Sequence, residues 1–91
     1  MSTLKIFIKG VFFKQISRGE KYEECRKIKP FWTSRLYDKE GKRIPYEFIE
    51  FINGMKPDAP RMTTEYLGLS KRKDEYVIKV GKVLKRKNFK K

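Results

Sequence analysis

The sequence contains 91 residues, of which 24 are Lys or Arg, 11 are Asp or Glu and none is His, so its formal net charge is +13. The absence of histidine excludes Ser-His-Asp and Cys-His catalytic sites and His-ligated metal sites, and a single cysteine, Cys25, excludes an internal disulfide. The length fits one small domain, and the 38% hydrophobic and 14% aromatic content predicts a folded chain with a thin core. We therefore expect no metal and no other cofactor.

The first part of the chain predicts a strand, a helix and a second strand. Residues 3–9 alternate apolar and polar side chains, which is typical of a half-buried strand. Residues 11–18 change to a spacing of three and four between apolar side chains, which predicts a helix that ends at Gly19. Residues 20–26 predict a short strand in which most residues are charged. Such a strand lies at a solvated edge or lines a polar cleft.

The middle of the chain predicts an aromatic segment and a loop before the next strands begin. Residues 28–37 contain a proline followed by two aromatic residues, and a short turn of helix starts there at Thr33 or Ser34. Residues 38–45 form a polar loop around a glycine.

Three further strands are predicted in the second half. They cover residues 46–52, 61–69 and 75–84, and the pair Asn53-Gly54 predicts a turn after the first of them. Within the last strand, Gly81 indicates a bulge.

The predicted fold belongs to the α+β class. About five short strands with one short helix after the first strand favour a small, partly open β-barrel. Residues 1–84 form this single domain, and residues 85–91 form a basic, flexible C-terminal tail.

Positive charge gathers toward the two ends of the chain. Residues 1–45 have a net charge of +7 and residues 71–91 have +8, whereas residues 46–70 have −2. A charge balance of this kind predicts a polyanionic partner, which is nucleic acid or an anionic membrane surface, unless the charge serves solubility alone. We favour nucleic acid.

A short segment in the charged strand carries a family resemblance. Residues 17–26, SRGEKYEECR, contain Gly19, Lys21, Glu24 and Arg26. They resemble the G-x-K-x-x-E-x-R motif of the ASCH domain, a branch of the PUA-like superfamily. KPFWTSRL (29–36) and FINGMKPDAPRMTTEYLGL (51–69) are also similar to the family, so the resemblance covers the chain from about Leu4 to Val80.

The resemblance implies both a fold and a function. It implies a small PUA-like β-barrel whose cleft is bordered by the first helix and the motif strand. ASCH domains bind RNA in translation or act in transcription coregulation, and some members hydrolyse acetylated cytidine or RNA.

The motif strand also has a physical interpretation of its own. Because side chains alternate along a strand, Glu24 and Arg26 share one face and are expected to form an ion pair on the cleft side. Arg26 and Lys21 would then bind a phosphate or a base edge, with Glu24 orienting Arg26. The alternative is a surface row of ion pairs that contributes little.

An enzymatic function requires Lys21 and Glu24 as the catalytic residues. The amidohydrolase members are understood to use a Lys, Thr and Glu trio, and the resemblance places Lys21 at the lysine and Glu24 at the threonine. Glu65 is a candidate for the downstream glutamate. Because no hydroxyl stands at position 24, we favour binding over hydrolysis.

Further residues are candidates for contacts with nucleic acid. Phe31 and Trp32 are candidates for a stacking platform or for core packing, with Trp32 expected near the cleft. Asn53 is a candidate amide at the cleft mouth or a turn residue. Arg61 flanks that turn and extends a positive rim. The tail supplies basic side chains that contact phosphates or remain solvated, namely Lys85, Arg86 and Lys87.

The sequence therefore predicts an RNA-binding or single-stranded nucleic-acid-binding domain. The alternatives are a hydrolase of a modified nucleoside, a ribonuclease, and a protein-binding adaptor of the type that phages encode. No apolar stretch approaches the roughly 20 residues that span a bilayer, so we expect no membrane partner and a cytoplasmic location.

Overall fold

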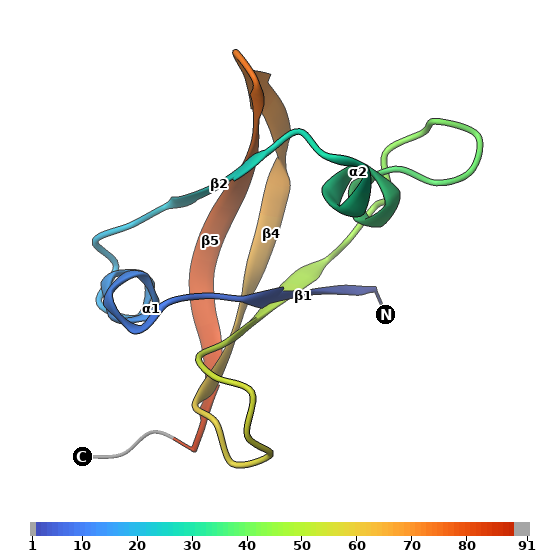
Figure 1. The fold of residues 1–91 in the computed structure, drawn as a ribbon. Helices are drawn as coiled ribbons and strands as arrows, with labels where there is room; N and C mark the ends of the chain where they lie inside the picture. The colour runs from blue at the N-terminus through green and yellow to red at the C-terminus, as the bar shows by residue number, and fades with distance from the viewer. Residues whose placement is uncertain (1, 89–91) are drawn as a thin grey trace.

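Five strands and two helices form within residues 2–88, the part of the chain that the computed structural model describes (Figure 1). In chain order they are β1 Thr3–Phe7, α1 Gly10–Ser17, β2 Glu23–Lys27, α2 Pro30–Leu36, β3 Phe48–Ile52, β4 Arg61–Arg72 and β5 Glu75–Lys87. The strands form one sheet in the order β1-β3-β4-β5-β2. The β1–β3 pair is parallel and the other three pairs are antiparallel.

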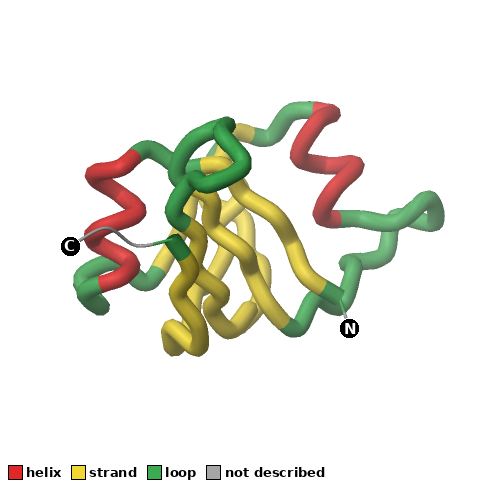
Figure 2. The backbone as a smooth tube through the Cα atoms, turned by 90° about the horizontal axis from the view of Figure 1, so that it is seen from below, coloured by secondary structure: helices red, strands yellow, loops and turns green. Residues whose placement is uncertain are grey.

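The sheet curls into a half-barrel that stays open between its two edge strands. β1 and β2 end the strand order, and each has a strand neighbour on one side only in the described chain. The guanidinium of Arg26 on β2 nevertheless reaches β1, because its Nη2 donates a hydrogen bond of 3.0 Å to the carbonyl of Phe7. The two helices lie on opposite sides of the molecule (Figures 1 and 2). The described chain therefore has the partly open, barrel-like sheet that was expected.

The helices differ from the expectation of one helix after the first strand. α1 begins and ends one residue earlier than predicted, and α2 is a second helix where only a short turn was expected. Pro30 occupies the first turn of α2, where its missing N–H costs nothing and its fixed φ favours the helix. Leu36 is the only residue of α2 that is buried. Its apolar spacing therefore carries little helical signal.

The last strand extends beyond its predicted end. β5 continues to Lys87, with Arg61 opposite Lys87 and Thr63 opposite Lys85 in the register with β4. The prediction of a flexible tail is therefore wrong for residues 85–87, and residues 89–91 lie outside the described residues. Backbone pairing with β4 holds this segment in the sheet, although its side chains alone do not indicate a strand.

The core fills the inside of the curled sheet with apolar side chains. Its fully buried members include Ile6, Phe51 and Ile78. Burial of one such side chain contributes roughly 1.5–3 kcal/mol to folding. α1 adds Phe13 and Ile16 to the same core. These two buried side chains hold the helix that borders the open seam against the sheet.

The bulge predicted at Gly81 is confirmed. The register between β4 and β5 shifts there, so that Glu65 faces Gly81 and Lys82. The carboxylate Oε1 of Glu65 accepts a hydrogen bond of 2.9 Å from the backbone N–H of Lys82. A Cβ on Gly81 would lie 2.8 Å from the Cβ of Glu65, so only glycine permits this close crossing.

Candidate functional site

A cleft of about 590 Å³ opens at the seam between the two edge strands. Its walls are the end of β1, the start of α1, the strand β2 and the turn that follows β3, and its lining consists of Phe7, Ile8, Lys9, Phe12, Glu24, Cys25, Arg26, Asn53, Gly54 and Met55. A volume of this order falls within the range of about 300–1,000 Å³ that small-molecule sites occupy. We call this hollow the Arg26 cleft.

A buried carboxylate takes part in the lining of the Arg26 cleft. Glu24 is only 5% exposed. Its Oε2 accepts a hydrogen bond of 2.7 Å from Nε of Arg26 and lies 2.6 Å from Nη2 of the same side chain. Nζ of Lys21 lies 3.6 Å from Oε1. Two cations thus compensate the cost of removing this carboxylate from water, and the predicted Glu24–Arg26 pair is confirmed.

Arg26 joins the two sides of the seam and is held on three sides. Besides Glu24 and the carbonyl of Phe7, its guanidinium contacts the indole ring of Trp32, with 5.0 Å between the guanidinium carbon and the ring centroid. This is a cation–π distance. None of its contacts within residues 2–88 involves Nη1. Arg26 is therefore fixed in position and still has N–H groups to donate.

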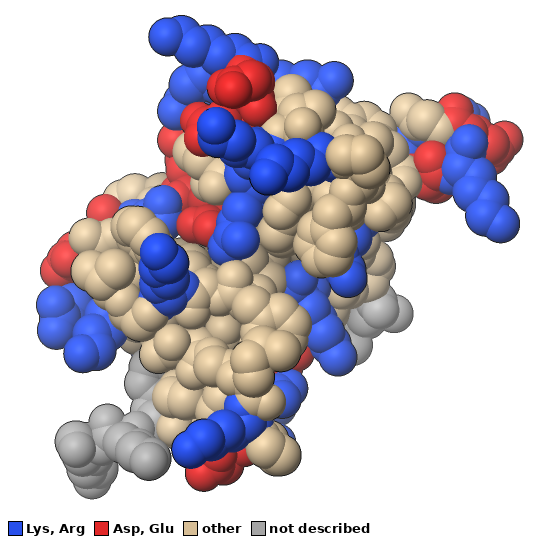
Figure 3. Space-filling view, viewed as in Figure 1, with Lys and Arg blue, Asp and Glu red and all other residues tan. Residues whose placement is uncertain are grey.

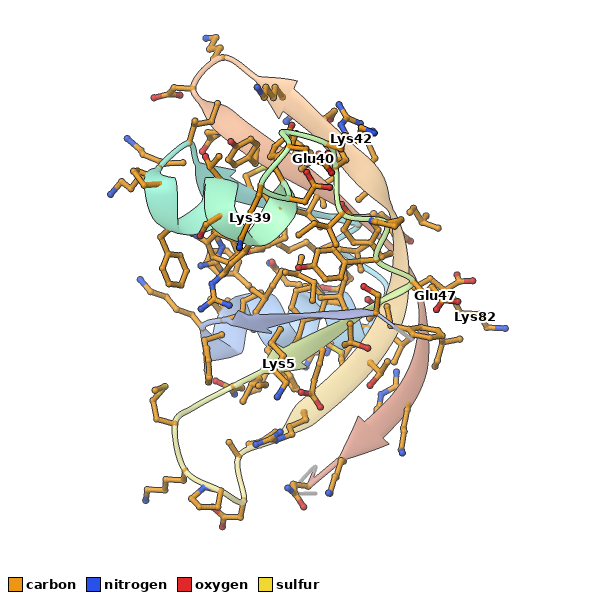
Figure 4. All side chains as sticks on the ribbon, turned by 90° about the vertical axis from the view of Figure 1, so that its right-hand side faces the viewer. Lys5, Lys39, Glu40, Lys42, Glu47 and Lys82 are labelled. Carbon is orange, nitrogen blue, oxygen red and sulfur yellow. The ribbon has the colours of Figure 1, made fainter. Side chains whose placement is uncertain are left out.

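A second hollow of about 390 Å³ continues from the Arg26 cleft along β1. We call it the side groove, and it is lined by Lys5, Phe7, Arg26, Phe31, Trp32 and Arg35. Phe7 and Arg26 belong to both hollows, so the two form one continuous surface. Figure 4 shows Lys5 on β1, which borders this groove.

Exposed aromatic rings alternate with cations along this surface. Phe7 is 50% exposed, Phe12 41% and Phe31 57%. Arg35 covers the ring of Phe31 at 4.3 Å from its centroid, and Lys21 covers the ring of Phe12 at 5.4 Å. On the face that carries β1, Lys and Arg side chains, with some Asp and Glu among them, surround a largely uncharged central area (Figure 3). The surface thus offers both flat apolar rings and positive charge.

Asn53 lies on the wall of the Arg26 cleft and has an uncommitted side chain. Its backbone N–H donates to the carbonyl of Pro60, whereas its side-chain amide makes no hydrogen bond within the described chain. A Cβ on Gly10 would lie 3.4 Å from Nδ2 of Asn53. The first residue of α1 therefore lies next to this amide.

The remaining predicted residues lie outside the Arg26 cleft. Arg61, Lys85, Arg86 and Lys87 are neighbours where β4 begins and β5 ends, and we call them the basic end. Arg61 lies 3.7 Å from Glu50, and Arg86 donates hydrogen bonds to the carbonyl and hydroxyl oxygens of Ser17 at the end of α1. The basic end thus lies outside the Arg26 cleft, although Arg86 and Lys21 line one common hollow beside the end of α1.

The sequence missed several residues of the site. Of the predicted residues, Glu24, Arg26 and Asn53 line the Arg26 cleft and Trp32 lines the side groove, while Lys21 lies beside Glu24 and lines neither hollow. The other exposed apolar and cationic members were missed, namely Lys5, Phe7, Phe12, Arg35 and Met55. One signal was available, because Phe7 stands among lysines on the polar side of the alternating pattern of residues 3–9.

Glu23 provides an internal contrast to its neighbour Glu24. It lies on the other face of β2, where its carboxylate is 3.3 Å from Nη2 of Arg72 and 3.6 Å from Nζ of Lys79. The hydrogen bond from Arg72, followed by the charges of Arg72 and Lys79, lowers the pKa of Glu23, while desolvation opposes the shift. Two adjacent glutamates thus meet different surroundings, and only Glu24 lines the cleft.

Comparisons with known proteins leave the family resemblance as a proposal. No protein-family model matches the chain, and no curated protein matches it. None of the helices in residues 2–88 is long and apolar enough to cross a membrane. The same residues contain no group of three or more His, Cys, Asp and Glu side chains placed to hold a metal ion.

Proposed function

We propose that this chain binds single-stranded RNA, or single-stranded nucleic acid more generally, through the Arg26 cleft and the side groove. The observation that carries the proposal is the row of exposed rings, Phe7, Phe12 and Phe31, interleaved with Lys21, Arg26 and Arg35. Proteins that bind single strands combine stacking platforms with a positively charged groove. The net charge of +13 supports the same partner class.

The shape of the site favours a single strand over a duplex. Bases in a duplex keep their faces stacked, so a duplex would offer this surface only phosphates and sugars. A single strand can place an unstacked base in a hollow of about 590 Å³ and leave its phosphates among the lysines of the rim. The exposed phenylalanine rings therefore stabilise the complex with a single strand, because only its unstacked bases can pack against them.

An ASCH-type, PUA-like identity and a cytoplasmic location are further parts of this proposal, and the place of the cleft supports the first of them. The cleft lies between the helix after the first strand and the strand that carries Lys21, Glu24 and Arg26. The ASCH resemblance implies a cleft in this place. Hydrolysis is the less favoured function, because no side-chain hydroxyl is found among the described residues that line the cleft.

Binding of a fluorescent oligouridine, measured by anisotropy at increasing salt, tests the proposal. We expect the affinity to fall steeply between about 50 and 200 mM salt, and an unlabelled duplex of equal length to compete poorly. Unchanged affinity over this range would contradict the electrostatic part of the proposal. Equal competition by the duplex would contradict the role of the aromatic rings.

A further inference from the structure

The hollow beside the end of α1 has a volume of about 490 Å³, and we call it the third hollow. It lies between residues 16–22, which end α1 and lead into β2, and the bulge of β5 at Gly81. The pairing of β2 with β5 ends at Lys79, so within residues 2–88 the following edge of β5 has the end of α1, and not a strand, beside it. This part of the sheet is therefore open to a ligand.

Positive charge dominates the lining of the third hollow. The described residues that line it include one carboxylate, Glu65, and four cations, Arg18, Lys21, Lys82 and Arg86. Oε1 of Glu65 accepts a hydrogen bond of 2.9 Å from the backbone N–H of Lys82, so this acid is part of the bulge. Arg86 is held in place by Ser17, whose carbonyl oxygen accepts from Nη2 at 2.8 Å and whose hydroxyl accepts from Nε at 3.2 Å. The hollow therefore presents concentrated positive charge, part of which is fixed in position.

Lys21 connects the third hollow with the Arg26 cleft. Its Nζ lies 3.6 Å from Oε1 of Glu24 and 5.4 Å from the centroid of the Phe12 ring, and both of these residues line the Arg26 cleft. The cleft adjoins the start of α1 and the third hollow adjoins its end. α1 has eight residues, which corresponds to a length of about 12 Å. A strand seated in the cleft therefore reaches the third hollow within a few nucleotides, even at the helical rise of about 3.4 Å per nucleotide.

We infer that the third hollow binds phosphates of the same single strand whose bases occupy the Arg26 cleft, an inference that rests on the proposed function. Phosphate oxygens accept hydrogen bonds, and lysine and arginine side chains only donate them, so the four cations suit a phosphate backbone. Contacts with phosphates position a strand without reading its sequence. The third hollow therefore adds affinity that depends on the length of the strand and not on its bases.

The test compares a uridine trimer with a uridine decamer on a variant of the third hollow. Arg18→Gln combined with Lys82→Gln removes two of its cations. Both side chains are exposed and neither makes a hydrogen bond or an ion pair within residues 2–88, so we expect the variant to fold, as thermal melting will show. The decamer should bind this variant roughly tenfold more weakly than the wild type, with a salt slope reduced by about 1. The affinity for the trimer, which is too short to fill both hollows, should change less than about twofold.

A matched variant separates the third hollow from the net charge of the protein. Lys27→Gln combined with Lys73→Gln removes the same charge from exposed positions near the turn between β4 and β5, and these residues line none of the three hollows. It should weaken binding of the decamer less than about threefold. Unchanged decamer affinity in the Arg18/Lys82 variant, or an equal loss in the two double variants, would overturn the inference and leave the proposed function intact. Failure of both oligomers to bind the wild type would contradict the proposed function as well.

Discussion

The Arg26 cleft and the basic end both present several cations but hold them differently. Arg26 is fixed by a buried carboxylate, a backbone carbonyl and an indole ring, and exposed aromatic rings lie among the other cations around it. The basic end places its cations on a pair of strands, with Arg61 near Glu50 and Arg86 tied to Ser17. A fixed cation beside rings can distinguish one ligand from another, whereas cations on an open strand attract any polyanion. The difference predicts specificity in the first region and sequence-independent affinity in the second.

The largest effect is expected when the guanidinium of Arg26 is changed. Arg26→Lys keeps the charge but loses the fork to Glu24, the bond to the Phe7 carbonyl and the planar contact with Trp32. We expect binding of oligouridine to weaken more than about tenfold, and the free energy of unfolding to fall by about 1–3 kcal/mol. Fluorescence anisotropy and thermal melting measure the two quantities.

The control for Arg26→Lys is the same substitution at the hairpin tip. Arg72 pairs with the exposed Glu23 and lines neither hollow. Arg72→Lys should leave binding within about twofold of the wild type, because an exposed pair of this kind contributes little. If Arg26→Lys and Arg72→Lys lose equal affinity, the fixed position of Arg26 does not matter for binding, which would contradict the account.

Removal of the indole is expected to have the second-largest effect. Trp32→Ala deletes a ring of the side groove and the surface on which Arg26 rests, at a cost to binding of roughly 1–3 kcal/mol. Trp32→Phe, which keeps a flat ring, should recover most of the affinity. If Trp32→Ala and Trp32→Phe both bind the oligonucleotide as tightly as the wild type, Trp32 contributes to packing and not to binding.

A smaller effect is expected at the basic end. Replacing Lys85 and Lys87 with Ser should weaken binding about threefold at low salt and reduce the salt slope by roughly 1–2, without changing the preference for a single strand over a duplex. The matched control replaces Lys39 and Lys42, which lie on the loop after α2 (Figure 4). This control should change the affinity less, and a changed preference for single strands in the Lys85/Lys87 variant would contradict the assigned division of roles.

The smallest effect concerns stability at alkaline pH. Burial raises the pKa of Tyr66 above its ordinary value of 10.0, with the charge of Arg43 opposing the shift. Because the folded-state pKa is the higher one, the neutral phenol stabilises the fold below about pH 10, and this contribution is lost as pH rises through the folded-state value. Tyr66→Phe should match the wild type near neutral pH and lose less stability at alkaline pH. Chemical denaturation at increasing pH measures this difference. An equal fall in the free energy of unfolding for the wild type and Tyr66→Phe would contradict the role of Tyr66.

Much of the fold follows from local patterns in the sequence, and the site follows only in part. Alternation placed Glu24 and Arg26 on one face of a strand, and Gly81 indicated a bulge. The contact of Arg26 with Phe7 depends on the parallel pairing of β1 with β3, which brings two distant edge strands together. No local pattern contains that information.

The two errors at the ends of elements have a physical cause in tertiary pairing. α2 has one buried residue, so its helical spacing is faint, and Lys85–Lys87 are held in a strand by the partner β4. The surroundings of Phe31 show a similar limit. Phe31 and Trp32 were predicted as a stacking platform, and the structure adds Arg35, one helical turn away, whose guanidinium covers the exposed ring of Phe31.

An NMR titration of the wild-type protein with a short single-stranded oligouridine tests the central claim most directly. The account predicts that the Nε–H signal of Arg26, the indole N–H of Trp32 and the side-chain amide of Asn53 shift together, with one dissociation constant. Signals of the basic end should shift less on addition of the oligonucleotide, and their shifts should be the first to vanish as the salt concentration is raised. Shifts confined to Lys85–Lys87, with the cleft signals unchanged, would contradict the account.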